Sequence, residues 1–451
     1  MKFGKDFAWG VATSSYQIEG AAFEDGKGMS VWDVFAHQEG SVKDGHNGDI
    51  ACDHYHRYKE DVHLLKELGV KAYRFSIAWT RILPEGIGKI NQKGVDFYNH
   101  LIDELVAAGI EPYITLFHWD YPYALEQKGS WLNEESPKWF EEYARTVFTL
   151  FADRVKYFIT FNEPQCFVGA GYGQGGHAPG LKRGNCDIVR MAHNVLKAHG
   201  LAVRAFREIA PNGKIGYAPT CSAAIPFSDK AEDIEAARAK YFDVTKDTLT
   251  WNVSWWSDPV LLGRYPEETE AFELYGKYLP DGWREDLKVI SEPIDFYAQN
   301  IYHGSYFKAF EKGYKKVLDP LNTARSGIGW PVMPSALYWG PKFLYERYGL
   351  PILISENGMC CHDTVSLDGM VHDPNRIDYM HRYLCEISKA IEDGIEITGY
   401  MYWSFMDNFE WALGYVPRFG LVYVDYETQK RIKKDSFAWY AQTIKENGEF
   451  L

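Results

Sequence analysis

Two hydrophobic patterns alternate along the chain. Short runs rich in β-branched and aromatic residues are followed by longer stretches in which apolar residues recur every three or four positions, as at Tyr58, Val62, Leu65 and Leu68. The short runs predict buried strands and the longer stretches predict amphipathic helices. The predicted strands are 7–12, 72–77, 112–116, 158–161, 214–218, 296–300, 352–354 and 399–403.

Residues that commonly begin or end helices lie between these runs. The helix predicted over 94–108 stops before Gly109, which readily adopts the left-handed conformation of a C-terminal cap. Another helix is expected to begin with Ser136 as its N-cap and Pro137 at its first helical position. Further helices are predicted over 53–68, 188–209, 231–245, 376–392 and 436–444.

A strand followed by a helix, repeated eight times, is typical of a closed parallel barrel. The length of 451 residues would suggest about three domains at roughly 150 residues each. However, no Ser/Gly-rich linker or low-complexity tract divides the chain. We therefore predict an α/β fold in which residues 1–451 form a single-domain (β/α)8 TIM barrel with extended βα loops.

Active sites of such barrels lie at the C-terminal ends of the strands, where this chain has two glutamates, Glu163 and Glu356. Two carboxylates in one cavity cannot both ionise easily, so one can act as an acid while the other is a base or nucleophile, as glycoside hydrolysis requires. A cation at Arg74 beside Glu356 would keep Glu356 ionised and leave Glu163 protonated. The alternative is that these residues form ordinary ion pairs at strand ends.

Other residues at the same strand ends suit a carbohydrate. Sugar rings present C–H faces that pack on aromatic rings, and their hydroxyls need both donors and acceptors, although core packing is the alternative for any single tryptophan. The candidate aromatic residues are Trp119, Trp330, Trp403, Trp411 and Phe419, and the polar candidates are Gln17, His118, Asn162, Asn300, Tyr302 and Glu410.

The composition of the chain limits the classes of molecule that it can bind. Lys and Arg number 48 and Asp and Glu 62, so the net charge of −14 leaves no basic surface for nucleic acid or anionic lipid. The first residues lack the apolar core of a secretory signal and no run reaches the ~18 apolar residues of a membrane span, so a cytoplasmic location is expected. Cys360-Cys361-His362 has no second ligand pair, so no metal is expected, and two carboxylates need no cofactor. A homo-oligomer stays open.

Six motifs, spread from about residue 3 to about residue 445, resemble glycoside hydrolase family 1, the β-glucosidase family. They are FAWGVATSSYQIEG at 7–20, YRFSIAW at 73–79, HWD at 118–120, TFNEP at 160–164, ISENG at 354–358 and NFEW at 408–411.

The resemblance implies a retaining double displacement in which Glu163 is the acid/base and Glu356 the nucleophile. By the same resemblance, Asn162 would contact the sugar 2-hydroxyl, and Tyr302 with Arg74 would orient Glu356. Trp403 would form the floor under the sugar and Trp330 would border the leaving group, while Gln17, His118, Glu410 and Trp411 would bind the remaining hydroxyls.

The resemblance also bears on the substrate. Relatives that act on 6-phosphosugars replace the equivalent of Glu410 by a smaller neutral residue, so Glu410 implies an unphosphorylated sugar. Plant thioglucosidases of the family carry glutamine at the acid/base position, and Glu163 is intact. We expect hydrolysis of terminal β-D-glucosyl residues from cello-oligosaccharides or aryl and alkyl β-glucosides, with galactosyl and fucosyl residues left open. A 6-phospho-β-glucosidase and a non-catalytic sugar-binding barrel are the alternatives.

Three segments depart from simple patterns. Gln165 stands where many family members have tryptophan, and Cys166 and Phe167 follow it towards the leaving-group side. Asn300-Ile301-Tyr302-His303 differs from the commoner Asn-Tyr-Tyr-Thr but keeps the tyrosine. Residues 171–176 fit G-x-G-x-x-G, yet they do not join a strand directly to a helix, so we expect a flexible loop rather than a nucleotide site.

Overall fold

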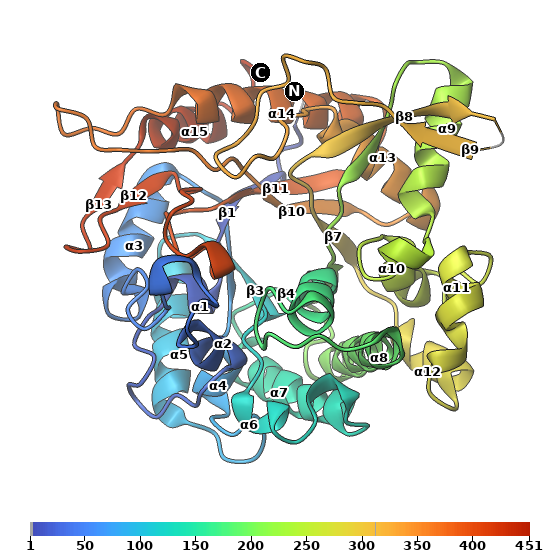
Figure 1. Ribbon diagram of the computed structural model, residues 1–451. Coiled ribbons are helices and arrows are strands. Elements are labelled where there is room, and N and C mark those ends of the chain that lie inside the picture. Colours follow the sequence, from blue (N-terminus) through green and yellow to red (C-terminus); the bar gives the residue numbers. More distant parts are fainter. Residues whose placement is uncertain (1–2, 312) are drawn as a thin grey trace.

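Eight parallel strands close into a barrel at the centre of the protein (Figure 1), and its computed structural model describes residues 3–311 and 313–451. Each strand pairs with the next barrel strand along the chain, and pairing of the first with the last, Ala8 opposite Gly399, closes the ring. The strands are β1 (Ala8–Ala12), β2 (Ala72–Ser76), β3 (Glu111–Phe117), β4 (Tyr157–Asn162), β5 (Lys214–Ala218), β7 (Phe296–Asn300), β10 (Ile352–Asn357) and β11 (Ile397–Trp403).

All eight predicted strands and the barrel class are confirmed. The strands read as nearly continuous apolar runs because helices cover the outside of the barrel while side chains fill its interior. The largest difference in length is at β10, which continues beyond residue 354 to Asn357, so that Glu356 belongs to the strand itself.

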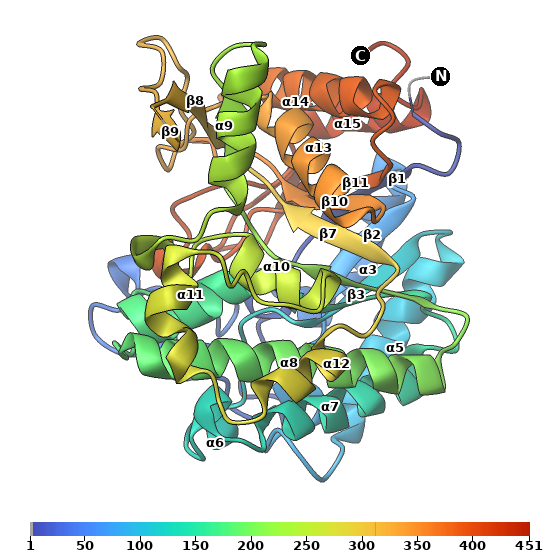
Figure 2. The same ribbon diagram turned by 90° about the vertical axis from the view of Figure 1, so that its right-hand side faces the viewer.

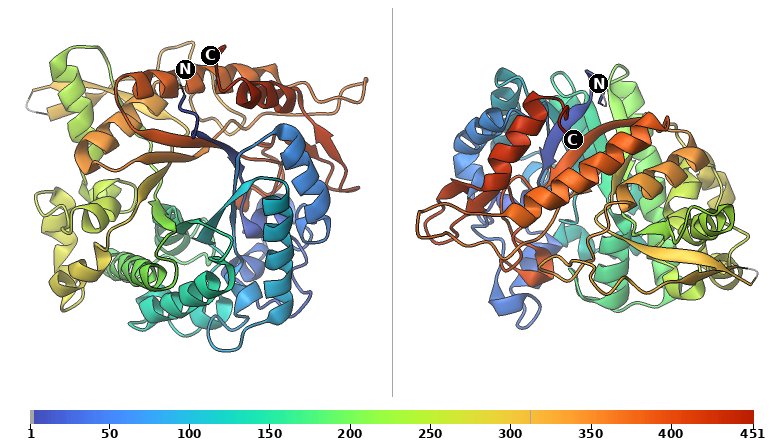
Figure 3. Two further views of the ribbon diagram at one scale, coloured as in Figure 1. Left: turned by 180° about the vertical axis from the view of Figure 1, so that it is seen from behind. Right: turned by 90° about the horizontal axis from the view of Figure 1, so that it is seen from above.

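Long helices surround the barrel, as Figure 3 shows from behind and from above. They are α3 (His54–Leu68), α5 (Gln92–Ala107), α7 (Ser136–Phe151), α8 (Asn185–Ile209), α13 (Ala336–Tyr348), α14 (Pro374–Glu392) and α15 (Asp435–Lys445). The helix predicted over 94–108 ends as expected, because Gly109 has a φ of 77°. Ser136 was wrongly expected to be an N-cap: Glu135 occupies that position, and Ser136 is already helical. None of the described helices is long and apolar enough to cross a membrane.

Four α-helices lie in the connection between β5 and β7, at the side that faces the viewer in Figure 2. The first, α9 (Ala231–Phe242), was predicted as far as residue 245 but ends earlier because Asp243 is extended. The other three, and α13 above, were not predicted. They are α10 (Ser254–Leu261), α11 (Glu270–Tyr275) and α12 (Trp283–Ile290).

Two small sheets lie outside the barrel. Strands β6 (Ala223–Pro226), β8 (Gly304–Phe310) and β9 (Gly313–Lys316) form one, in which β6 runs parallel to β8 although one follows β5 and the other follows β7. Helix α9 packs on this sheet, as Figures 1 and 2 both show. The other is a hairpin of β12 (Val422–Val424) and β13 (Arg431–Lys433).

Short helices occupy the loops. They are α1 (Ser15–Ile18), α2 (Val31–Ala36), α4 (Trp79–Ile82), α6 (Tyr123–Glu126), η1 (Lys43–Gly45), η2 (Ser130–Leu132), η3 (Gln165–Gln174), η4 (Lys246–Thr248), η5 (Gly276–Tyr278) and η6 (Trp411–Leu413).

The segment that fits G-x-G-x-x-G was wrongly expected to be a flexible loop. Its first four residues belong to η3, a helix of the π type that starts two residues after Glu163. A side chain at Gly171 would lie 2.3 Å from the carbonyl oxygen of Ala178, so this glycine permits close backbone packing.

A buried ionic cluster ties together the loops that follow β10 and β11. The Lys434 ammonium bonds Asp363 and Asp407, while the Arg418 guanidinium bonds Asp407 and that of Arg376 bonds Asp363. The contact between Lys434 and Asp363 joins the two connections, whereas Arg418 pairs with Asp407, and Arg376 with Asp363, within one connection each. Because these charges are removed from water, each depends on its partner. The cluster thereby fixes the loop that carries Glu410.

Candidate active site

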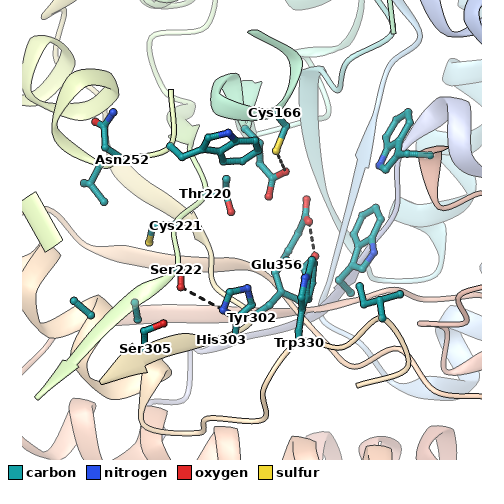
Figure 4. Close-up of a pocket in the computed structure, with 18 of the residues that line it drawn as sticks. Cys166, Thr220, Cys221, Ser222, Asn252, Tyr302, His303, Ser305, Trp330 and Glu356 are labelled. Carbon is teal, nitrogen blue, oxygen red and sulfur yellow. Dashed lines mark hydrogen bonds between the residues drawn. The ribbon is translucent and has the colours of Figure 1, made fainter. Parts of the chain in front are cut away.

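A cavity of about 600 Å³ lies at the C-terminal ends of the barrel strands, where the site was expected. Figure 4 shows part of its lining, with Glu356, Tyr302 and Trp330 together and Ser222 and Ser305 to one side. Ten of the fourteen candidate residues line the cavity: His118, Trp119, Glu163, Tyr302, Trp330, Glu356, Trp403, Glu410, Trp411 and Phe419. The other four, Gln17, Arg74, Asn162 and Asn300, are buried and bond to residues around it.

Glu356 is held from two sides. The Arg74 guanidinium donates to Glu356 Oε1 at 2.7 Å, and the Tyr302 hydroxyl donates to Oε2 at 2.7 Å. Arg74 is completely buried in β2 and also donates to the Ser355 carbonyl oxygen, so its position is fixed relative to β10. The predicted contact between Arg74 and Glu356 is therefore present, and both carboxylate oxygens of Glu356 have donors.

Glu163 has neutral partners. The Asn300 amide donates to Glu163 Oε1 at 2.8 Å, and the Cys166 thiol donates to Oε2 at 3.2 Å. Asn162 links the two carboxylates, because its Oδ1 accepts from Arg74 at 2.7 Å and from Asn300 at 2.9 Å. The carboxylates are thus parts of one hydrogen-bonded network, with the cation on the side of Glu356.

The cavity raises the pKa of its carboxyl groups. Burial raises the pKa of Glu163, and hydrogen bonds from Asn300, Cys166 and Thr220 together with the charge of Arg74 oppose this effect. Burial also raises the pKa of Glu356 to about 7, against the effect of Arg74 and with that of the neighbouring Glu163. The pKa of Glu410 rises to about 8 through burial and the charges of Glu356 and Glu163. Burial thus shifts all three carboxyl groups towards their neutral forms.

Three residues of the site have left-handed backbone conformations that non-glycine residues seldom adopt. The φ angles are 77° at Trp119, 46° at Glu163 and 51° at Trp411. Each such residue costs on the order of 1–3 kcal/mol, so surrounding contacts must hold it. The Trp119 indole donates to the Asn162 carbonyl oxygen at 3.0 Å, and the Glu163 backbone N–H donates to that of Ala218 at 2.7 Å.

Among the described residues that line the cavity, His118 Nδ1, His177 Nδ1 and Glu410 Oε2 are buried without a protein partner. Arg74 can only donate, so Asn162 presents Oδ1 to it and its amide N–H to His118 Nε2, 3.1 Å away. Burial keeps the pKa of His118 well below its usual range, so the ring is neutral and its proton is on Nδ1. That nitrogen and Glu410 Oε2 are both buried without a protein partner. Together they can serve a ligand hydroxyl that donates and accepts.

Aromatic rings surround these polar groups. The rings of Trp403 and Trp411 are each 5.9 Å from that of His118 and nearly parallel to it, at 17°. On the other side, Trp330 packs 5.1 Å from Tyr302, between their ring centroids. Gly358 is needed beneath this site, because a Cβ there would lie 1.7 Å from the Trp403 carbonyl oxygen.

Gln17 has all its polar groups engaged. Its amide donates to Asn408 Oδ1 at 3.0 Å and to the Phe409 carbonyl oxygen at 2.8 Å, and its Oε1 accepts from Ser14. Gln17 thus holds the backbone immediately before Glu410. Its predicted contact with a sugar hydroxyl stays a prediction.

Sequence reasoning missed the other half of the cavity, which the small β6–β8–β9 sheet and α9 provide. Cys221 bonds the Tyr241 hydroxyl at 2.6 Å, and Ser222 bonds His303 Nδ1 at 3.2 Å, the contact drawn in Figure 4. The apolar run 223–226 after β5 was the available signal. The further lining residues of this half are Thr220, Ala223, Ala224, Lys240, Asp243, Trp251, Asn252, Val253, Ser305 and Phe307.

Among the described residues, no group of three or more His, Cys, Asp or Glu side chains is arranged to hold a metal ion. The site brings together two buried carboxyl groups, Glu163 and Glu356, with unequal partners. They stand beside an unpaired donor and acceptor in an aromatic cavity.

Comparisons with known proteins agree with this geometry. Residues 1–449 match the model of glycosyl hydrolase family 1. The chain is 47% identical to β-glucosidase A of Thermotoga maritima, over 99% of this chain and 98% of the relative, and 45% identical to β-glucosidase A of Acetivibrio thermocellus, over 99% of each. Its fold matches a solved family 1 β-glucosidase of Thermotoga maritima in complex with isofagomine lactam, with a TM-score of 0.90, 46% identity and 99% coverage of each chain.

Proposed function

Because the chain belongs to glycosyl hydrolase family 1, it is a retaining glycosidase, and we propose that Glu163 and Glu356 are its two catalytic carboxyl groups. The observation that carries this assignment is their unequal set of partners within one cavity. Glu356 receives a hydrogen bond from a cation, whereas Glu163 receives hydrogen bonds from a neutral amide and a thiol. A cationic donor favours the charged carboxylate more strongly than neutral donors do.

In the first step, Glu356 attacks the anomeric carbon while Glu163 gives its proton to the oxygen of the leaving group. Arg74 and Tyr302 hold Glu356 in place for this attack. Esterification removes the negative charge of Glu356, so Glu163 loses a repulsive neighbour and its pKa falls. Glu163 then accepts a proton from a water molecule whose oxygen attacks the anomeric carbon. The bond to Glu356 breaks, and the sugar leaves with its original anomeric configuration.

The sugar in the cavity is proposed to be an unphosphorylated β-D-glucosyl unit. Glu410 Oε2 and His118 Nδ1 would bind its hydroxyls, Asn162 its 2-hydroxyl, and Trp403 and Trp411 would pack along it. Glu410 would be a poor partner for a phosphate, because its carboxyl group supplies no positive charge and repels the phosphate once it ionises, which disfavours the 6-phospho-β-glucosidase alternative. A non-catalytic role is disfavoured because both carboxylates face the cavity.

The proposed substrates are cello-oligosaccharides and aryl or alkyl β-glucosides. Relatives from Thermotoga neapolitana that are 45–46% identical to this chain are named 1,4-β-D-glucan glucohydrolase. The outer half of the cavity offers space beyond Glu163 for the leaving group, with Trp330 at its border.

The test is Glu356→Ala assayed with an aryl β-glucoside. Loss of the nucleophile should lower kcat by a factor on the order of 10⁴ or more. Azide should then restore turnover and yield the α-glucosyl azide, because it attacks from the side that the carboxylate occupied. Glu134→Ala, which removes an exposed glutamate that does not line the cavity, is the control and should keep wild-type kcat. Near-wild-type hydrolysis by Glu356→Ala would refute the assignment.

A further inference from the structure

Cys166 contacts the carboxyl group that is proposed to transfer protons. It lies three residues after Glu163, on the first turn of η3, and its backbone N–H donates to the Glu163 carbonyl oxygen at 2.9 Å. This turn brings the Cys166 Sγ to 3.2 Å from Glu163 Oε2, and both residues line the cavity (Figure 4). We propose that Cys166 is a positioning residue for Glu163. Its thiol donates a hydrogen bond to the charged carboxylate and interacts only weakly with the protonated carboxyl group. The proposal rests on the acid/base role of Glu163.

The position of the acidic proton follows from the second partner of Glu163. Asn300 donates an N–H to Oε1, so that oxygen acts as an acceptor in both protonation states. The proton of the acid form therefore belongs on Oε2, the oxygen that Cys166 contacts. Cys166 is thus adjacent to the proton that the leaving group receives.

A thiol suits this place because it is a weak donor and a weak acceptor. When Glu163 is charged, the S–H donates to Oε2 and keeps it turned into the cavity. When Glu163 is protonated, the sulfur competes poorly for the proton, which stays available to the glycosidic oxygen. An amide or carboxylate in its place would bind that proton more strongly.

The thiol keeps its own proton. Burial, together with the charges of Glu163 and Glu356, raises the pKa of the Cys166 thiol well above its usual range. Cys166 is therefore a donor at every pH at which the enzyme would work, and it adds no charge of its own to the site.

Several other groups influence the protonation of Glu163 and are kept constant in the test. Arg74 on β2 favours its charged form, and Glu356 on β10 favours its neutral form. The remaining titratable groups around it are Glu410 in the loop after β11, Tyr302 after β7 and Cys221 after β5.

The experiment compares Cys166→Ala with Cys166→Ser through the pH dependence of kcat/KM. The basic limb of this profile reports loss of the proton from the acid in the free enzyme. Alanine removes a donor from the carboxylate, so the basic limb should move up by about half a pH unit, the size of one weak hydrogen bond. Serine restores a donor, so its basic limb should lie at or below that of the wild type.

The acid limb, which reports ionisation of the nucleophile, should stay in place in both variants.

Kinetics with two substrates give a second readout. Methyl β-glucoside needs a proton on its leaving group, so Cys166→Ala should lower its kcat several-fold, whereas a dinitrophenyl β-glucoside should be almost unaffected.

Cys186→Ala is the control, since it removes a thiol on α8 that does not line the cavity. Its basic limb should remain at the wild-type position. Equal shifts in the alanine and serine variants, or an unmoved limb in Cys166→Ala, would overturn the role of Cys166.

Glu163→Gln separates that outcome from failure of the proposed function. If Glu163→Gln loses activity on methyl β-glucoside while Cys166→Ala changes nothing, Glu163 remains the acid and the inference about Cys166 is wrong. If Glu163→Gln retains activity on methyl β-glucoside, the acid/base assignment itself fails.

Discussion

Tyr302→Phe would remove one hydrogen bond from the proposed nucleophile and leave its other contacts intact. The Tyr302 hydroxyl donates to Glu356 Oε2 at 2.7 Å, while its ring packs against Trp330 and Phe419 and its backbone carbonyl accepts from α14 tyrosines. Phenylalanine keeps the ring and the backbone. The perturbation is therefore confined to the carboxylate.

The size of the effect follows from the bond that is lost. A hydrogen bond to a charged group contributes about 1.5–3 kcal/mol, which corresponds to a rise of about one to two units in the pKa of Glu356. Because burial already raises that pKa to about 7, the variant would be largely protonated at Glu356 in neutral solution. Only the ionised nucleophile attacks, so kcat/KM should fall by about 10- to 100-fold on the acid limb.

The loss should depend on pH in a defined way. On the acid limb Glu356 is largely protonated in both enzymes, and the ionised fraction is about 10- to 100-fold smaller in the variant, so the full loss of kcat/KM appears there. On the basic limb Glu356 is ionised in both enzymes, so kcat/KM should approach the wild-type value. Initial rates with an aryl β-glucoside between about pH 4 and 9 would measure both limbs. Tyr241→Phe, which removes a hydroxyl that bonds Cys221 in the same cavity, is the control and should leave the acid limb in place. An equal loss at every pH would refute the reasoning.

Two further variants test the charges around the site. In Glu410→Gln the basic limb should move to lower pH, because Glu410 ionises at about 8 and its charge then raises the pKa of Glu163; a limb that stays in place would contradict this coupling. Lys434→Met should lower the free energy of unfolding by about 3–5 kcal/mol, since it leaves Asp363 and Asp407 buried with one cation fewer. Calorimetric unfolding would measure this loss. The neighbouring Lys433→Met removes an exposed ion pair with Glu67 and should lower the free energy of unfolding by at most about 1 kcal/mol. Equal losses of stability in the two variants would argue against the role of the buried cluster.

The barrel could be predicted because its strands are buried on both faces and therefore appear as short apolar runs. The strands β8 and β9 gave no such signal, because polar residues such as Lys308 and Lys315 alternate with aromatic ones and the two strands are only partly buried. The pairing of β6 with β8 joins segments about 80 residues apart, and no local pattern specifies that register.

The two carboxylates, Trp119 and Trp403 could be predicted for a related reason, since each ends a barrel strand or follows one within two residues. The contacts among them could not. Gln17 bonds Asn408, 391 positions away, and Cys166 reaches Glu163 because Glu163 has a left-handed backbone conformation and a π-type helix begins two residues later. Such contacts depend on backbone angles that residue type and spacing do not reveal.

The cavity is assembled from two parts of different origin in the chain. Its proposed catalytic carboxyl groups are attached to barrel strands, whereas its outer half rests on the β6–β8–β9 sheet, which is made from insertions after β5 and β7. Substitutions in that sheet can alter what enters beside the sugar without moving the barrel strands. Sequence changes in this sheet can therefore alter which leaving groups fit without changing the catalytic carboxyl groups. Directed evolution for new glycosides would begin at residues 220–224 and 303–307.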